Sequence, residues 1–355
     1  MKKLFAILLA LAMVFSLAAC GGSENTEATT EATEAATEAT EITTEATTEA
    51  TEESVEATEN CEPINVMVLN GTTGFGMANL MDASANGQAQ VAYNFTVETD
   101  ASNIVAALVN GSADIAALPT NAAAAVYNKT QGGVQVLVLN TLGVLYLVTD
   151  GSVTVESMAD LAGQTVYAPA QNPSFIFQHI CQANGLTDVT IDNTYAQPAD
   201  LNTAVASGEV SIAVLPEPMV TVAKSKNPEL VVALDLTAEW DKVSPAGSLV
   251  QGCVVVRTAF AQENPGAVAE FLTEYEASIN TMLSDVEGTA AKIEAQGIFA
   301  KAAVAAKAIP NCNVCFITGE DMKAALGEFL NIMHSVAPAS VGGAIPGDDF
   351  YCILG

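Results

Sequence analysis

Few residues of this chain could perform acid–base or nucleophilic chemistry. The two histidines are His179 and His334, and His179 stands in an apolar stretch of a predicted helix, where packing is its more common role. No G-x-S-x-G sequence is present, so a serine hydrolase would lack the turn that exposes its nucleophile. Asp348 and Asp349 adjoin Gly and Pro residues and are typical of a solvated loop. The sequence therefore predicts no catalytic residue, and we expect that this protein is not an enzyme.

Cys312 and Cys315 form a single C-x-x-C pair among seven cysteines. A zinc site would need two further ligands, and only His334 and Cys352 lie nearby in the sequence. A redox pair would be expected at the start of a helix that follows a strand, whereas Pro310 precedes this pair and a strand-like run follows it. We therefore favour a local thiol pair or disulfide over a zinc site, and we expect no metal and no cofactor.

The sequence contains more residues suited to ligand binding than to catalysis. They are small polar residues in loops that follow predicted strands. In open α/β sheets, ligands collect at the carboxyl ends of the strands, where the next helix presents unpaired N–H groups. Five loops fit this description. The candidate ligand-binding residues in these loops are Thr72, Thr73, Gly74, Phe75, Thr120, Asn121, Thr141, Asn172, Ser174 and Glu217.

Structural alternatives exist for these candidates. Thr120 and Asn121 could cap the helix that they begin, and Glu217 could complement a helix dipole instead of accepting hydrogen bonds from a ligand. The glycine-rich turn at 71–76 lacks both the G-x-G-x-x-G spacing and a P-loop Lys, so it does not indicate nucleotide binding. No Lys or Arg falls in the five loops, which leaves the charge of the ligand open.

Four aromatic residues could stack on a planar heterocycle, although aromatic side chains more often belong to the core. They are Phe75, Tyr146, Tyr167 and Trp240.

The elements that would position these loops alternate between strand and helix. The predicted strands cover 64–69, 90–97, 113–119, 134–150 with an interruption near Gly143, 165–170, 189–196 and 210–216. The predicted helices cover 77–84, 101–111, 121–130, 155–163, 173–185, 198–209 and 217–227. Because the strands are too apolar to be half exposed, we predict mainly parallel sheets covered on both faces.

The first 62 residues have a different character. Lys2 and Lys3 precede an apolar run, as in a secretory signal, and an uncleaved membrane anchor is the less favoured alternative because the run is short. The residues around Cys20, LAACG, resemble the lipobox of bacterial lipoproteins, which implies a signal peptide at 1–19 and a lipidated Cys20. Residues 23–62 hold 13 Glu and no Lys, Arg, Gly or aromatic residue, so we expect residues 20–62 to form a disordered tether.

The remaining 293 residues are long enough for two lobes. They carry 28 acidic and 9 basic residues, a formal charge of −19, which makes nucleic acid and anionic lipid surfaces improbable partners.

A sequence pattern that occurs twice resembles a pattern of a known family. The sequences NGSADIAALPTNAAAAV and ASGEVSIAVLPEPMVTV each describe a helix that ends at Gly, a buried strand, and a Pro before the next helix. Together with L-x-x-G-x-x-D-I-A, NTLGVLYLV and ESMADLAGQTVYAP, they resemble the substrate-binding subunits of ABC importers. The nearest branch contains sulfonate-, nitrate- and thiamine-pyrimidine-binding proteins, the NMT1/THI5-like group.

The resemblance implies a two-lobed periplasmic-binding-protein fold of type 2. Lobe 1 would comprise 63–148 plus 250–355 and lobe 2 would comprise 149–249, with crossings near Val148-Thr149 and near Leu249–Gly252. The implied function is capture of a small organic or anionic solute between the lobes by hinge closure. The implied partners are an ABC permease and its ATPase.

The leader and tether predict that a lipid anchors the protein to the extracellular face of a Gram-positive-type cell membrane. We also expect the protein to be a monomer. Two alternatives stay open: a sensor or receptor domain that serves no permease, and an enzyme of the pyrimidine-precursor or menaquinone-route type on the same fold.

Overall fold

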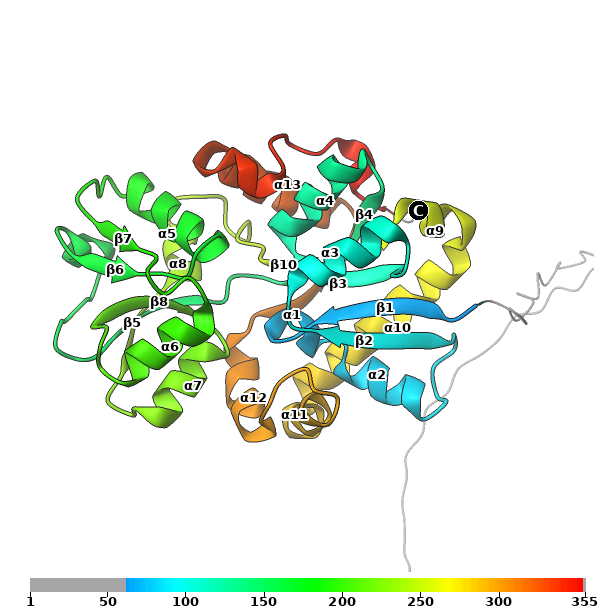
Figure 1. The fold of residues 1–355 in the computed structure, drawn as a ribbon, viewed down its shortest axis with the longest axis horizontal. Helices are drawn as coiled ribbons and strands as arrows, with labels where there is room; N and C mark the ends of the chain where they lie inside the picture. The colour runs from blue at the N-terminus through cyan, green and yellow to red at the C-terminus, as the bar shows by residue number, and fades with distance from the viewer. Residues whose placement is uncertain (1–61, 354–355) are drawn as a thin grey trace, which may run out of the picture. The chain divides into compact units, whose positions relative to one another are not determined.

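The computed structural model describes residues 62–353, whose fold is drawn in Figure 1. The predicted signal peptide, the lipidated Cys20 and the tether lie outside the described residues. Two β-sheets carry the fold, with strand orders β11-β4-β10-β3-β1-β2 and β7-β6-β8-β5-β9. Among residues 62–353, no helix has both the length and the apolar character needed to cross a bilayer.

The strands of the first sheet come from both ends of the described chain. They are β1 (Ile64–Leu69), β2 (Tyr93–Glu98), β3 (Ile115–Pro119), β4 (Val134–Thr141), β10 (Gly252–Arg257) and β11 (Val314–Ile317). The strands of the second sheet are consecutive. They are β5 (Leu145–Thr149), β6 (Thr165–Tyr167), β7 (Thr190–Asp192), β8 (Ile212–Pro216) and β9 (Val231–Asp235).

Strand directions refine the prediction of mainly parallel sheets. Strands β1 to β4 share one direction and β6 to β9 share another, because β3 and β4 both pair antiparallel with β10, and β8 and β9 both pair antiparallel with β5. Strand β11 also runs antiparallel to β4. Both sheets are therefore mixed, because β5 and β10, the strands that carry the chain from one sheet to the other, run against their neighbours.

Helices cover both faces of each sheet. They are α1 (Thr72–Phe75), α2 (Ala78–Ala85), α3 (Ala101–Asn110), α4 (Thr120–Thr130), α5 (Asn172–Ala183), α6 (Pro198–Ala206), α7 (Met219–Lys226), α8 (Leu236–Asp241), α9 (Thr258–Glu263), α10 (Pro265–Ser284), α11 (Val286–Ala295), α12 (Ala302–Ala308) and α13 (Gly319–Val336). Short 3₁₀ helices are η1 (Met158–Leu161), η2 (Ile309–Asn311), η3 (Pro338–Val341) and η4 (Asp348–Phe350). Figure 1 shows α5 and α8 on one side of the second sheet and α6 and α7 on the other.

The alternation of side chains along the strands explains this layering. In β10, Cys253 and Val255 pack into the apolar cluster that contains the buried residues of α4 and α13. Val254 and Val256 point to the opposite cluster, which contains the buried residues of α2 and α10. A strand that is apolar on both faces needs helices on both faces, as the sequence predicted.

Several predictions differ from the structure. The glycine-rich turn at 71–76 contains the short helix α1, and the predicted helix at 155–163 is reduced to the 3₁₀ helix η1. The predicted boundary at residue 148 would put Leu145–Val148 in the first lobe, whereas the pairing of β5 with β8 and β9 puts them in the second sheet. The chain therefore crosses at 142–144, between β4 and β5, and it returns just before β10.

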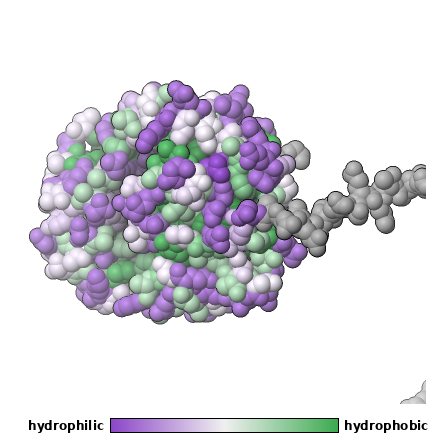
Figure 2. Space-filling view, turned by 45° about the vertical axis from the view of Figure 1, so that its right-hand side comes forward, coloured by the Kyte–Doolittle hydropathy of each residue, from purple (hydrophilic) through white to green (hydrophobic). Residues whose placement is uncertain are grey.

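Large exposed apolar side chains are scattered over several elements rather than gathered on one. They are Val109, Val231, Val232, Leu283, Ile345 and Ile353. Figure 2 shows one face of the molecule, on which hydrophilic and hydrophobic side chains are interspersed.

Candidate functional site

The carboxyl ends of several strands meet at one edge of each sheet. In the first sheet, β1 pairs parallel with β3, and Gly252 of β10 pairs with both Pro119 and Thr141, the last residues of β3 and β4. The loops after β1, β3 and β4 therefore share an edge. In the second sheet, β6 pairs parallel with β8, so the loops that lead to Asn172 and Glu217 share an edge as well.

Candidate residues from the two sheets are joined by direct hydrogen bonds. The Thr72 hydroxyl donates to the Glu217 carbonyl oxygen at 2.9 Å. The Asn172 amide donates to Asn121 Oδ1 at 2.7 Å. Near the first of these contacts, the Tyr146 hydroxyl donates to the Asn311 carbonyl oxygen at 2.9 Å. The structure thus joins Thr72 to Glu217 and Asn121 to Asn172, and the residues of each pair are far apart in the sequence.

Glu217 is a carboxylate buried at this junction, with 4% of its surface exposed. Its oxygens accept hydrogen bonds from the Thr221 backbone N–H at 3.1 Å and the Thr221 hydroxyl at 3.0 Å, and the Asn311 side chain donates a further one. Burial raises the pKa of Glu217, and these hydrogen bonds only partly oppose the shift. The ionised form of Glu217 therefore remains less stable here than in water, because its hydrogen bonds do not fully replace its hydration.

Asn121, Asn172 and Ser340 form a second polar group, which we call the amide cluster. Besides accepting from Asn172, Asn121 donates through Nδ2 to the Ser340 carbonyl oxygen at 3.4 Å. Two atoms of the cluster, Asn172 Oδ1 and Ser340 Oγ, are buried and have no hydrogen-bond partner. An unpaired buried polar atom costs about 1–3 kcal/mol, so such atoms are rare unless a further group pairs with them.

Sequence reasoning missed Ser340, Asn311 and Thr221. Ser340 lies in η3 and Asn311 in η2, and neither follows a predicted strand. Only the proximity of Thr221 to Glu217, one helical turn away, could have been found from spacing.

Several predicted site residues serve the fold instead. The prediction that Phe75 binds the ligand is wrong, because its side chain is fully buried in the core. Its ring packs edge-on against Phe299, with 6.1 Å between the ring centroids. A side chain on Gly74 would collide with the Leu69 carbonyl oxygen, so this glycine permits a close approach of backbones. Trp240, a candidate for stacking on a ligand, is also fully buried, and its Nε1 donates to the Ser248 hydroxyl.

Three hydroxyl groups of the candidate set bond to neighbouring protein groups. The Thr120 hydroxyl donates to the Val250 carbonyl oxygen at 2.8 Å, beside the returning chain. The Thr141 hydroxyl donates to Asn140 Oδ1 at 3.0 Å, and the Ser174 hydroxyl donates to the Pro169 carbonyl oxygen at 2.9 Å. The Thr73 carbonyl oxygen accepts a hydrogen bond from Asn140 Nδ2 at 3.0 Å.

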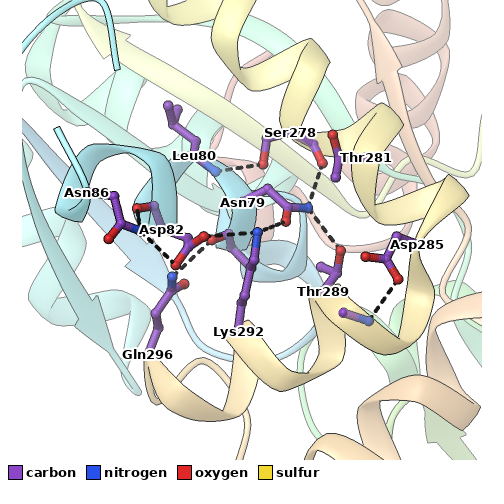
Figure 3. Close-up of polar contacts among 12 residues, drawn as sticks. Asn79, Leu80, Asp82, Asn86, Ser278, Thr281, Asp285, Thr289, Lys292 and Gln296 are labelled. Atoms are coloured by element: carbon purple, nitrogen blue, oxygen red, sulfur yellow. Dashed lines mark hydrogen bonds and ion pairs between the residues drawn. The ribbon is translucent and has the colours of Figure 1, made fainter. Parts of the chain in front are cut away.

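A polar cluster on helices α2, α10 and α11 holds the segment that follows Thr72 (Figure 3). The Ser278 hydroxyl accepts from the Leu80 N–H at 3.0 Å and donates to the Gly76 carbonyl oxygen at 2.5 Å. Asn79 Nδ2 donates to the Ser278 carbonyl oxygen and to the Thr289 hydroxyl. These bonds fix the start of α2 and, with it, the turn that presents Thr72.

The described cavities lie elsewhere. One of about 740 Å³ is lined by residues of α2, β2 and α11, among them Phe95 and Lys292. Another, of about 510 Å³, lies beside α5 and is lined by Ser174, Cys181 and Asn193, among others. Each is confined to one lobe, so a ligand in it would not lie between the lobes. The hydrogen-bonded junction is therefore the better candidate site.

The cysteines and histidines of the described residues form no reactive group. Cys312 and Cys315 are free thiols, and burial raises the pKa of both to about 12. Within residues 62–353, no three His, Cys, Asp or Glu side chains are grouped so that they could hold a metal ion. His179 Nε2 lies 2.8 Å from the Ser244 hydroxyl, and its ring packs on Trp240.

Comparison with known proteins identifies the family. The sequence model described as NMT1/THI5 like matches residues 88–288, more than half of the chain. The chain belongs to the NMT1/THI5-like family. No curated protein matches its sequence.

Solved structures of low sequence identity share the fold of this NMT1/THI5-like protein. An ABC transporter from Parabacteroides distasonis is 23% identical, with a TM-score of 0.71 over 82% of this chain and 98% of the other. The periplasmic aliphatic sulphonate binding protein SsuA from Escherichia coli is 14% identical, with a TM-score of 0.66 over 80% and 96% of the two chains.

A ligand binding component of an ABC-type import system from Staphylococcus aureus, solved with zinc bound, is 11% identical, with a TM-score of 0.62 over 82% and 97%. These matches confirm the predicted two-lobed periplasmic-binding-protein fold.

Proposed function

We propose that this protein is the solute-binding subunit of an ABC importer and that it captures a small organic or anionic solute between its two lobes. The observation that carries the proposal is the pair of hydrogen bonds between strand-end residues, Thr72 to Glu217 and Asn172 to Asn121. Polar groups that bond to one another across a junction can bond to a ligand when the lobes part. The family match and the similarity to solved proteins of ABC transport systems support this choice.

The mechanism requires no covalent step. A ligand that bonds to both lobes has higher affinity for the closed arrangement, and this difference in affinity drives the hinge toward closure. The permease and ATPase would then recognise the closed form. The scarcity of groups suited to acid–base chemistry at the junction favours a binding protein over an enzyme on the same fold.

The position of the protein in the cell is part of the proposal. The lipobox-like residues around Cys20 support attachment of the chain to the outer face of the cell membrane by a lipid, with the acidic segment as a tether. The scattered distribution of exposed apolar side chains supports a monomer.

A thermal-shift screen of the purified protein tests the proposal. The panel would contain sulfonates, nitrate, pyrimidines, amines and vitamin precursors. A ligand at about one hundred times its Kd adds roughly 2.7 kcal/mol to the free energy of unfolding, which raises Tm by several degrees. Stabilisation by a compound that is recovered unchanged is the expected result. Chemical conversion of that compound would favour the enzyme alternative, and binding without any effect on uptake by cells would favour the sensor.

A further inference from the structure

Three carboxylate side chains are buried in the described part of the chain, and their partners differ. Asp114 lies 2.6 Å from Arg257 Nη2, and Glu239 lies 2.7 Å from Lys242 Nζ. Glu217 is the most buried of the three, yet within residues 62–353 it forms no ion pair. Because a buried charge is costly unless it is paired, the difference calls for a cationic partner from outside the chain.

The groups around Glu217 do not supply that positive charge. Thr221 and Asn311 are neutral donors, and together they occupy three of the roughly four acceptor positions that a carboxylate offers. The titratable groups near it are the Tyr146 hydroxyl and the Cys312 thiol, and the Asp235 carboxylate acts on the same tyrosine. None of these three groups is cationic. The carboxylates of Asp235 and Glu217 both raise the pKa of Tyr146, after the larger effect of burial. The potential at this side of the junction is therefore negative.

The amide cluster also presents an acceptor rather than a donor. Asn121 Nδ2 donates to the Ser340 carbonyl oxygen, so Asn121 Oδ1 is the atom that faces Asn172. Asn172 must then turn its Nδ2 toward Asn121, which leaves its Oδ1 as the unpaired atom. Only a donor can pair with this oxygen. Asn172 is 8% exposed, so in the closed arrangement water has little access to it.

We infer that the junction selects a small organic cation with N–H donors, an ammonium, amidinium or guanidinium ion, whose charge pairs with the Glu217 carboxylate. The inference rests on the proposed function and narrows its ligand class. It separates this chain from a receptor for sulfonates, because the candidate loops contain no Lys or Arg that could neutralise an anion.

The test is isothermal titration of the purified protein with ligands matched in shape and different in charge. The panel contains small primary amines, amidines and guanidines, each with its neutral hydroxyl or amide isostere and with a sulfonate of the same length. The variant is Glu217→Gln, which keeps the size and removes the charge. The matched control is Glu239→Gln, the same change at a buried carboxylate that already has a cationic partner.

The inference predicts that cations bind, and that Glu217→Gln weakens their binding roughly 10- to 100-fold, as expected for loss of a hydrogen bond to a charged group. Glu239→Gln should leave the affinity unchanged, which excludes a general effect of the acidic surface. Preferential binding of sulfonates or neutral isosteres, or equal affinity of Glu217→Gln for the cations, would overturn the inference and leave the proposed function intact. Failure of all three charge classes to bind would instead contradict the proposed function.

Discussion

The Ser278 hydroxyl offers a quantitative test of how the turn that carries Thr72 is held. It is buried where α10 packs on α2, and it accepts from the Leu80 N–H (Figure 3). It also donates to the Gly76 carbonyl oxygen. Replacement by Ala removes both partners at once and leaves a backbone donor and a backbone acceptor unpaired in a buried position.

The expected cost follows from these two groups. Each buried backbone group without a partner costs about 1–3 kcal/mol, so Ser278→Ala should lower the free energy of unfolding by about 2–6 kcal/mol. For a domain of this size, about 1 kcal/mol corresponds to roughly 2 °C, which gives a fall in Tm of roughly 4–12 °C. The assay is thermal unfolding followed by circular dichroism.

The control is Ser284→Ala, the same substitution in the last turn of the same helix. Ser284 is exposed and bonds only to carbonyl oxygens of its own helix, so the change in stability should stay within about 0.5 kcal/mol. Equal Tm values for Ser278→Ala and Ser284→Ala would refute the argument that these hydrogen bonds hold the turn.

Three further predictions concern core packing, the crossing and pH. Phe75→Ala should cost about 3–5 kcal/mol in denaturant unfolding, and an unchanged midpoint would place Phe75 outside the core. Gly143→Ala should destabilise by about 1–3 kcal/mol because a Cβ would collide with Thr237, whereas Gly266→Ala, which meets open space, should not. Burial raises the pKa of Glu217, so its protonation stabilises the folded state at low pH and this contribution is lost as pH rises through the folded-state pKa. Wild type should therefore lose Tm relative to Glu217→Gln as the pH rises above the ordinary range of a glutamate carboxyl, and a difference in Tm that stays constant with pH would contradict the burial argument.

The sequence predicted the layers of the fold well because buried strands leave a strong local signal. The apolar runs of β3 and β8, each ended by Pro before a helix, identified both the strands and the loops that follow them. The extent of β5 was harder to predict, because one apolar run from 134 to 150 contains two strands that belong to different sheets. The interruption predicted near Gly143 separates the two strands, but only the hydrogen-bonded pairing, which is not local, assigns β5 to the second sheet.

The candidate site was predictable in part for the same reason. Position after a strand selected Asn121, Asn172 and Glu217, which the structure brings to the junction. The same rule also selected Phe75. Its burial depends on contact with Phe299, a residue more than two hundred positions away in the sequence. It could not select Ser340 or Asn311, because their approach to the junction depends on how the C-terminal helices pack.

The central claim is that both lobes hold the ligand, and alanine variants from each lobe test it directly. The measurement is the affinity of one ligand from the screen for wild type, for Asn121→Ala in the first lobe and for Asn172→Ala in the second. Exposed asparagines at helix ends provide the controls, Asn86→Ala in the first lobe and Asn184→Ala in the second.

The account predicts that both junction variants lose at least about fivefold in affinity, the equivalent of one hydrogen bond, while both controls bind as wild type does. Loss in only one lobe, or in neither, would contradict a site shared between the lobes.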